Sequence, residues 1–346
     1  MALCCEIISL WCFPITFLLF LVISKIFLKF PRLLHKKKNG NFSIFHISHR
    51  GGAGEDTENT IQSFQNAFNI RTDMFETDVH LTKDGQVVTI HDQELLRLFN
   101  SNTKVSDYEF KDLPEFTKPL PLSFPSKAFK THCLSDKFPK KVLLLEELFE
   151  TFPKTMINID IKINNDELID KVYRLIKKYK LEEYIIWGSF NHAIFRKLKP
   201  KYPDIQTFCS FTDALKTIFF FNIGLLPFIP INYEYFEFPL FSIIIRKLNK
   251  RSSDFDLIPR YSKTINRIRD AIIFKIAFNR NMFKHLNDRG IPVLMWVANS
   301  VEEFDEALVK YKANGVMTDF PNELSKYLND RPEICNNKKY NVNKQD

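Results

Sequence analysis

Apolar residues follow two different spacings along most of this chain. Short runs rich in β-branched and aromatic residues, most of them closed by a polar residue, predict strands that end at Ser48, Val79, Ile90, Ile161, Ser189, Ser210, Ala298 and Thr318. Between many of these runs, apolar residues recur every three or four positions, which is typical of amphipathic helices. Strands that alternate with helices over residues 41–330 predict a TIM barrel, the (β/α)8 fold of the α/β class.

Several local features sharpen this prediction. A helix is expected behind a cap at Asn59 or Thr60, and its buried face consists of Ile61, Phe64, Ala67 and Phe68. A later helix has the same spacing at Phe304, Ala307, Leu308 and Tyr311. Strict barrel order also leaves room for a strand in the FSIII segment at 241–245. Scattered prolines without a clear period predict an irregular insertion over residues 101–141.

The N-terminus carries the longest apolar run. No charge occurs from Ile7 to Ser24, and a basic cluster from Lys25 to Lys38 follows. This order differs from that of a cleaved signal peptide, so we expect an uncleaved transmembrane helix with the basic cluster and the main domain on the cytoplasmic side. The predicted organisation is an anchor and juxtamembrane segment at 1–40, a catalytic barrel at 41–330 and a polar tail at 331–346.

A second apolar stretch covers residues 217–245, where prolines and Gly224 interrupt the sequence. We favour an interfacial or re-entrant segment that faces lipid, and a buried core element and a second membrane span remain as alternatives. Arg246, Lys247, Lys250 and Arg251 follow directly, as expected beside anionic head groups.

The net charge of +8 is concentrated near the anchor. Residues 1–40 hold six lysines and arginines against one acid, which leaves +3 for the other 306 residues. This balance, without a recognition motif, argues against a nucleic-acid partner. No obligate protein partner is inferred. The six cysteines show no zinc or disulfide spacing, and no GxGxxG, Walker or GxSxG motif indicates dinucleotide, NTP or serine-hydrolase chemistry.

Ionisable residues gather where the predicted strands end, which is the catalytic edge of a TIM barrel. Glu76 and Asp78 are two positions apart on one strand, so their carboxylates share a face within an apolar run. Two such carboxylates repel each other unless a cation lies between them. We therefore expect a divalent metal site that Asp160 completes, with Mg²⁺ favoured and Ca²⁺ as the alternative.

Two histidines and two cations accompany this site. The turn at Asp84-Gly85 predicts a two-residue hairpin whose register places His91 opposite Asp78, as a metal ligand or as an acid/base beside the metal. His49 and Arg50 precede Gly51, Gly52 and Gly54, whose backbone N–H groups are expected to approach an anion. Arg50 and Lys162 suit phosphate, and the two imidazoles suit proton transfer. Together these groups predict metal-assisted phosphodiester cleavage.

The motifs HISHRGGAGEDTENTIQSFQNAF, FETDVHLTKDGQVVTIHD, NIDIK, MWVAN and GVMTDFP, in this order, resemble the glycerophosphodiester phosphodiesterase family, from about His46 to Leu328. The resemblance implies a barrel of the phospholipase-C-like phosphodiesterase type. It assigns the acid/base pair to His49 and His91, phosphate binding to Arg50 and Lys162, and the metal to Glu76, Asp78 and Asp160, with His91 as an additional ligand. Trp296 is expected near the substrate or in the core, and Asp319 as a helix cap.

With its anchor, the chain looks most like the membrane-bound lysophospholipase D branch of this family. That resemblance implies hydrolysis of lysophosphatidylcholine or N-acyl-lysophosphatidylethanolamine to lysophosphatidic acid, on the cytoplasmic face of the endoplasmic reticulum or perinuclear membrane. In the family, the glycerol hydroxyl of the substrate is thought to attack phosphorus. Two alternatives remain. The first is hydrolysis of water-soluble glycerophosphodiesters to glycerol 3-phosphate, and the second is a non-catalytic membrane scaffold.

Overall fold

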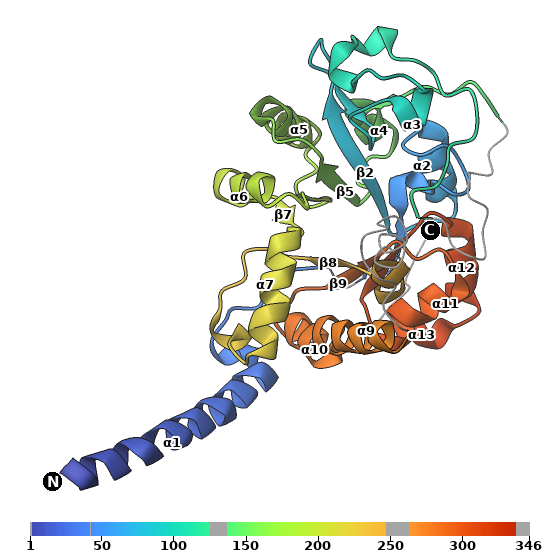
Figure 1. Cartoon of the computed structure of the whole chain (residues 1–346). Helices are drawn as coiled ribbons and strands as arrows, with labels where there is room; N and C mark the ends of the chain where they lie inside the picture. Colours follow the sequence, from blue (N-terminus) through green and yellow to red (C-terminus); the bar gives the residue numbers. More distant parts are fainter. Residues whose placement is uncertain (1, 42, 125–136, 247–262, 337–346) are drawn as a thin grey trace.

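The computed structural model describes residues 2–41, 43–124, 137–246 and 263–336. Its centre is a ring of eight parallel strands that follow one another in chain order (Figure 1). They are β1 (His46–Ser48), β2 (Met74–Leu81), β5 (Ile157–Ile161), β6 (Ile185–Gly188), β7 (Gln206–Thr207), β8 (Phe236–Pro239), β9 (Val293–Trp296) and β10 (Gly315–Thr318). The ends of the sheet meet where the Cys209 N–H donates to the Tyr235 carbonyl at 3.0 Å, between β7 and β8. The chain therefore forms the TIM-like barrel that its sequence predicts.

Helices cover the outside of this ring (Figure 1). They are α2 (Ile61–Asn69), α4 (Leu145–Thr151), α5 (Asp166–Tyr179), α6 (His192–Lys201), α7 (Phe211–Asn222), α9 (Lys263–Ala277), α10 (Arg280–Asp288), α11 (Val301–Phe304), α12 (Pro321–Asn329) and α13 (Pro332–Asn336). In α5 the buried residues Leu168, Val172 and Ile176 are spaced by four, so a single face packs against the barrel. The Asn165 side chain caps this helix by accepting the Leu168 N–H.

The structure confirms each marked strand and corrects the position of the remaining one. Residues 241–246, which include the FSIII segment, are helical, so the strand prediction there is wrong. The missing barrel strand is β8, just before it, where Phe236 pairs with Val293 of β9. Its four residues include the ionisable Glu237 and end in Pro239, which weakened the strand signal in the sequence.

Both helix faces are largely as predicted. Thr60 is the N-cap of α2 and accepts the Ser63 N–H, and Phe64 and Ala67 are buried. Phe68 is 49% exposed, so its assignment to the core face is wrong. It follows Ala67 by one position, which turns it about 100° away around the helix. The later face of Phe304, Ala307, Leu308 and Tyr311 is fully buried, as expected.

The hairpin that follows β2 has a different register from the predicted one. β3 (Val87–Thr89) pairs with β2 so that Val79 faces Thr89, and the Ile90 N–H donates to the Asp78 carbonyl. Asp78 is therefore opposite Ile90, one position before His91. The loop has three residues instead of two, because the Thr82 hydroxyl accepts the Gln86 N–H and Gly85 takes a left-handed φ of +75°.

The predicted insertion contains short elements and its own small core. The elements in and around it are α3 (Leu96–Phe99), two 3-10 turns at Val105–Asp107 and Phe110–Asp112, and β4 (Leu143–Leu144), which pairs with β3. Buried Leu95, Leu98, Val105, Phe116 and Leu120 pack together beneath them. Within 101–141, residues 125–136 lie outside the described ones, as do 337–346 of the predicted tail.

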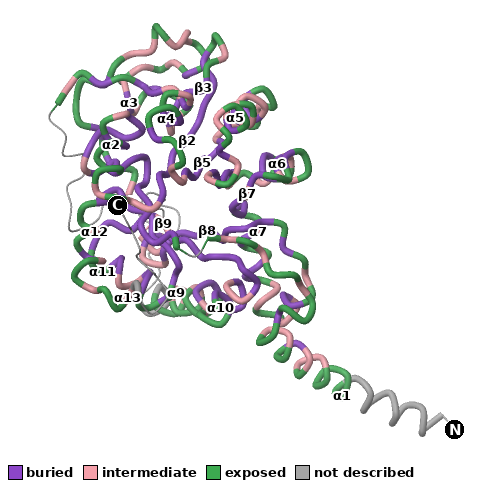
Figure 2. Tube along the Cα trace, turned by 180° about the vertical axis from the view of Figure 1, so that it is seen from behind, coloured by how far each residue is buried: buried purple, intermediate pink, exposed green. Residues whose placement is uncertain are grey.

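Helix α1 (Ala2–Lys29) projects from the barrel (Figure 2). It meets the barrel near the 3-10 turn Leu226–Phe228, where the Ser24 hydroxyl donates to the Gly224 carbonyl at 2.6 Å and Phe27 contacts Phe228. A second contact joins α1 to α10, where Nδ1 of His285 lies 2.9 Å from the Leu28 carbonyl oxygen. In the part of the chain that the structure describes, no helix is both long and apolar enough to span a membrane. The side chains of residues 2–13 lie outside that part, so the anchor stays a prediction.

The second apolar stretch, 217–245, is divided among the end of α7, the turn Leu226–Phe228, strand β8 and the helical residues 241–245. The stretch is therefore not one continuous helix. Ile218 and Leu226 are buried, whereas Phe219, Ile223 and Phe228 are exposed. The stretch therefore supplies both core and surface.

Candidate active site

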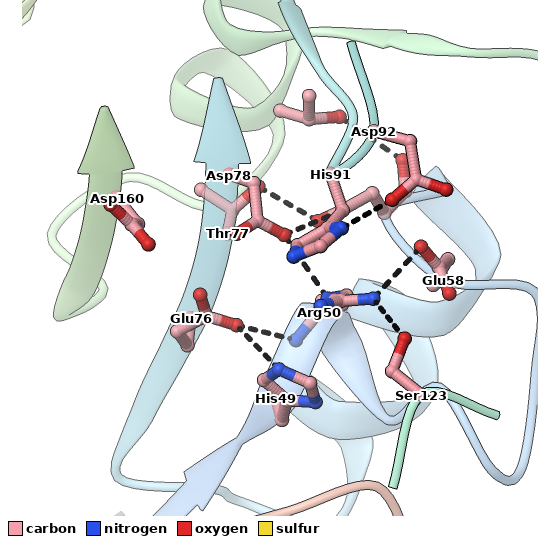
Figure 3. A network of polar contacts seen from close by, with 12 residues as sticks. His49, Arg50, Glu58, Glu76, Thr77, Asp78, His91, Asp92, Ser123 and Asp160 are labelled. Carbon is pink, nitrogen blue, oxygen red and sulfur yellow. Dashed lines mark hydrogen bonds and ion pairs between the residues drawn. The ribbon is translucent and has the colours of Figure 1, made fainter. Parts of the chain in front are cut away.

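A cavity of about 140 Å³ lies at the carboxyl ends of the barrel strands. Every residue that the sequence assigned to the site lines it: His49, Arg50, Glu76, Asp78, His91, Asp160, Lys162 and Trp296. In Figure 3, Glu76 and Asp78 project from the same face of β2 toward Arg50, and Asp160 comes from the neighbouring strand. The structure thus brings the predicted residues together, and what each does depends on its partners.

His49 is held by an aspartate from the other end of the chain. Its Nδ1 lies 2.5 Å from Oδ1 of Asp319, and Oδ2 of Asp319 accepts a hydrogen bond from Asn299 at 2.7 Å. The two residues meet because they directly follow β1 and β10, which pair through Ser48 and Thr318. The expectation that Asp319 caps a helix is wrong, since α12 has no side-chain cap. A carboxylate at Nδ1 fixes the ring and leaves Nε2 for the cavity.

His91 has a similar arrangement on the other side of Arg50 (Figure 3). Its Nδ1 lies 2.5 Å from Oδ1 of Asp92, whose other oxygen accepts from Nε of Arg97 at 2.5 Å. Burial opposes the charged form of Asp92, but hydrogen bonds from His91 and Arg97 lower its pKa below the usual range. Both imidazoles therefore have a carboxylate at Nδ1.

The three predicted metal ligands lie in a cluster with mixed charges. Asp78 is paired with Asp160 across β2 and β5, and Nζ of Lys162 lies 2.8 Å from Oδ1 of Asp78 and 2.6 Å from Oδ2 of Asp160. Burial and the adjacent Asp78 raise the pKa of Glu76 to about 8. The pKa of Asp78 stays well below its usual value, because Lys162, His91 and Arg50 outweigh its burial. Neighbouring positive charges thus stabilise the negative charge of Asp78 more than that of Glu76.

Among the described residues, no group of three or more His, Cys, Asp or Glu side chains is arranged as a metal site. Lys162 lies between Asp78 and Asp160, and Oε2 of Glu76 accepts the Arg50 backbone N–H at 2.9 Å. The metal assignment of Glu76, Asp78 and Asp160, and of His91 as a further ligand, therefore stays a prediction.

Arg50 is buried at the centre of the site. Its guanidinium contacts Asp78 through Nε at 3.1 Å, and Nη1 donates to Glu58 at 3.1 Å and to Ser123 at 3.2 Å. Its backbone has a φ of +52°, an uncommon value for a residue with a side chain. Arg50 and Lys162 both bind carboxylates in this structure, and their role in phosphate binding stays a prediction.

Two of the three glycines after Arg50 use their N–H groups for bonds within the chain. The Gly52 N–H donates to the His49 carbonyl and the Gly54 N–H to the Asp319 carbonyl. Gly52 has a φ of +103°, and a Cβ there would lie 2.7 Å from Cγ of Pro321. The expected anion contact is therefore wrong for these two N–H groups. Gly52 instead permits a close approach that keeps His49 beside Asp319.

Trp296 ends β9 at the wall of the cavity. Its ring lies 6.0 Å from that of Phe124 and 5.1 Å from that of Phe190, and its buried Nε1 has no hydrogen-bond partner among the residues that the structure describes. The residue thus belongs both to the aromatic packing and to the cavity lining, the two alternatives that the sequence left open.

Sequence reasoning missed several groups that complete the site. Asp92 orients His91, and it is one of the ionisable residues at the predicted strand ends, to which no role was assigned. Glu58 orients Arg50 from eight positions further along the same motif. Glu237 of β8 also lines the cavity. Its signal was a single acid within the apolar run FEFP, which is easily taken for the end of a strand.

Residues 49–323 match the glycerophosphoryl diester phosphodiesterase family. The chain is 40% identical over 309 residues to human lysophospholipase D GDPD1, covering 89% of this chain and 94% of that protein. It is 32% identical to human lysophospholipase D GDPD3, covering 89% and 92%. In fold it resembles a putative glycerophosphoryl diester phosphodiesterase from Silicibacter pomeroyi, with a TM-score of 0.59, 16% identity, and coverage of 85% and 96%. This chain belongs to the glycerophosphoryl diester phosphodiesterase family.

Proposed function

We propose that this protein is a lysophospholipase D, which releases the head-group alcohol from lysoglycerophospholipids and leaves lysophosphatidic acid. The observation that carries the proposal is a pair of imidazoles in one cavity, each fixed at Nδ1 by a carboxylate, beside three further carboxylates and two cations. The proteins named lysophospholipase D match nearly the whole chain, which favours a lipid substrate over a soluble diester.

The two histidines act as the acid/base pair. With its N–H at Nδ1, Nε2 of one neutral imidazole accepts the proton of the attacking hydroxyl. The other imidazole starts this step as an imidazolium, and its Nε2–H gives a proton to the oxygen of the leaving alcohol. Water then opens the cyclic phosphate with the two rings in reversed roles, which returns each ring to its starting state. Arg50 and Lys162 lie within the same cavity, where each exchanges part of its carboxylate contacts for phosphate oxygens.

A divalent cation held by Glu76, Asp78 and Asp160 is part of this proposal, with Mg²⁺ favoured and Ca²⁺ as the alternative. The donor set fits in kind, because hard cations prefer carboxylate oxygens. Two observations support it: Oδ1 of Asp160 is buried without a partner, and Glu76 lies buried beside Asp78 without a salt bridge to lysine or arginine in the described chain. Such an ion, when bound, polarises a phosphoryl oxygen.

The proposed partner is a lipid bilayer. Helix α1 exposes Ile15, Leu18, Leu19 and Val22. On the barrel, α7 and its C-cap expose Phe211, Leu215, Phe219 and Ile223 at intervals of four, and α9 exposes Ile268, Ile272 and Ile276 in the same way. The two helices meet where the Asn222 amide donates to the Ile276 carbonyl at 3.0 Å. Exposed apolar rows of this kind, beside an apolar helix, favour an interfacial position in the membrane.

The basic cluster from Lys25 to Lys38 favours a cytoplasmic catalytic domain, on the endoplasmic reticulum or perinuclear membrane. This orientation is tested by the sequon at Asn41, Phe42 and Ser43. A shift in gel mobility after deglycosylation would place the barrel on the opposite side of the membrane.

The activity is tested with purified full-length protein and either lysophosphatidylcholine or glycerophosphocholine, each with Mg²⁺, Ca²⁺ or EDTA, by measuring choline release. We expect release from the lysolipid that EDTA abolishes. Release from glycerophosphocholine alone would support the soluble diesterase instead. No release by folded protein with any ion would support the scaffold.

A further inference from the structure

A second cavity, of about 310 Å³, lies between α6 and α7 on the outside of the barrel. The two helices are neighbours (Figure 1), and residues 229–233, which follow the turn Leu226–Phe228, form the rest of its wall. Its inner side is apolar, with buried Phe195, Leu226 and Ile231. The cavity shares no lining residue with the active site, and the proposed mechanism does not use it.

Two exposed cations line this cavity, Arg196 of α6 and Lys216 of α7. Three other cations on α6 each form an ion pair with a carboxylate from another segment: Lys197, Lys199 and Lys201. Arg196 differs from them, because it forms no ion pair or hydrogen bond with any residue that the structure describes. The α6 cation that lines the cavity is thus the one whose charge is available to a ligand.

The cavity lining contains one acid, Asp213, and its carboxylate already has partners. Oδ2 accepts a hydrogen bond from the Ser210 hydroxyl at 2.5 Å and lies 3.1 Å from Nδ1 of His192. Oδ1 lies 3.9 Å from Nζ of Lys216, at the outer limit of an ion pair, so this lysine is held weakly. Two cations against one acid leave the lining with a formal charge of +1, with histidine counted as neutral. An arginine fork beside an ammonium group suits the oxygens of a phosphate.

The cavity borders the surfaces that we assign to the membrane. Lys216 directly follows Leu215, which belongs to the exposed apolar row of α7. Leu226, in the cavity wall, belongs to the turn on which α1 packs through Phe27 and Phe228, so α1 leaves the barrel near the end of α7 (Figure 1). A phosphate in the cavity therefore has an apolar surface next to it for attached acyl chains. Anionic lipids are a normal component of the cytoplasmic leaflet.

We propose that the cavity between α6 and α7 binds the phosphate of an anionic phospholipid. Arg196 and Lys216 contact the phosphate oxygens, and the acyl chains lie along the exposed row of α7. This inference rests on the membrane position in the proposed function and adds a head-group preference to it. A lipid with net negative charge binds more tightly than a zwitterionic one, because Arg196 and Lys216 repel the ammonium group of the zwitterion. The bound lipid then holds the barrel in one orientation on the membrane.

The test measures binding of two soluble short-chain lipids to the full-length protein in neutral detergent by isothermal titration calorimetry. Dihexanoylphosphatidylglycerol and dihexanoylphosphatidylcholine share the phosphate and the chains, and they differ in the charge of the head group. Wild-type protein is expected to bind the glycerol lipid about tenfold more tightly. Arg196→Gln and Lys216→Gln should each weaken its binding by about threefold to fivefold, the size of a partly exposed ion pair, and should change binding of the choline lipid less than twofold.

Arg174→Gln is the matched control, since Arg174 is an exposed arginine of α5 outside the cavity and should leave both affinities unchanged. None of these variants alters the basic cluster from Lys25 to Lys38, so their effects isolate the cavity. Inorganic phosphate at constant ionic strength should not displace the glycerol lipid, because it lacks the chains. Displacement would indicate a site for free phosphate and overturn the lipid assignment.

Equal binding of the two lipids by wild-type protein would overturn the site, as would unchanged affinity for the glycerol lipid in both folded cavity variants. Choline release from lysophosphatidylcholine, measured on the same preparations, separates this inference from the proposed function. Release without a head-group preference would contradict the cavity site alone. A head-group preference without release would contradict the lysophospholipase D activity alone.

Discussion

The contact between Asp319 and His49 makes the sharpest prediction about catalysis. Both side chains are buried, and Asp319 accepts hydrogen bonds from His49 through one oxygen and from Asn299 through the other. In Asp319→Asn, the new amide carbonyl satisfies Asn299, which leaves the NH₂ group facing Nδ1 of His49. That nitrogen must then accept, so the ring proton moves to Nε2, where His49 can no longer take a proton from the substrate.

Because the variant retains the hydrogen bonds around residue 319, we expect it to fold. Because Nε2 of His49 can no longer accept a proton, we expect it to lose activity. General acid–base catalysis contributes about 100- to 10,000-fold, so kcat should fall by that factor, equivalent to about 2.7–5.4 kcal/mol in the activation barrier. The assay is choline release from lysophosphatidylcholine, with Tm measured alongside. Asp330→Asn, an exposed substitution just past the end of α12, should behave as wild type. A folded Asp319→Asn protein with kcat within threefold of wild type would refute the tautomer argument.

Further predictions concern metal binding, the role of His49, the pH dependence of stability and the contact of the protein with the membrane. Glu76→Ala should abolish the rise in Tm that Mg²⁺ or Ca²⁺ produces in wild-type protein, and an unchanged rise would exclude Glu76 as a ligand. His49→Ala should abolish turnover but keep that rise, so loss of both would indicate that His49 is needed for metal binding. Burial lowers the pKa of His285 to about 4, so the stability that its neutral form contributes is present above about pH 6.5 and is lost as the pH falls toward 4. This loss is at most about 3 kcal/mol of the free energy of unfolding. Between pH 7.5 and 5, the free energy of unfolding measured with urea should therefore decrease less in His285→Gln than in wild-type protein. An equal decrease in the two proteins would show that His285 is not the cause. Ile272→Glu on the exposed row of α9 should reduce binding to anionic vesicles without changing Tm, and unchanged binding would argue against that row as a membrane contact.

The local pattern of the chain was enough to place every barrel strand except β8 and to identify the residues of the site. Glu76 and Asp78 share a face because side chains alternate along a strand, and that rule holds in any fold that contains the strand. The same holds for the cap at Thr60, which depends only on residues within one turn. The barrel then brings the carboxyl ends of its strands to one edge, so the eight assigned residues meet in one cavity.

Contacts between distant segments could not be obtained in this way. Asp319 orients His49 from 270 positions away, and Glu237 reaches Asn158 from the opposite side of the barrel, because ring closure decides which strand ends face each other. The hairpin register depended on one hydroxyl, that of Thr82, which lengthened the loop and moved His91 by one position. The sequence by itself therefore determined which groups are available for phosphodiester chemistry. Only the tertiary structure decided which of them are partners, since partnership depends on distances that alternating apolar and polar residues do not specify.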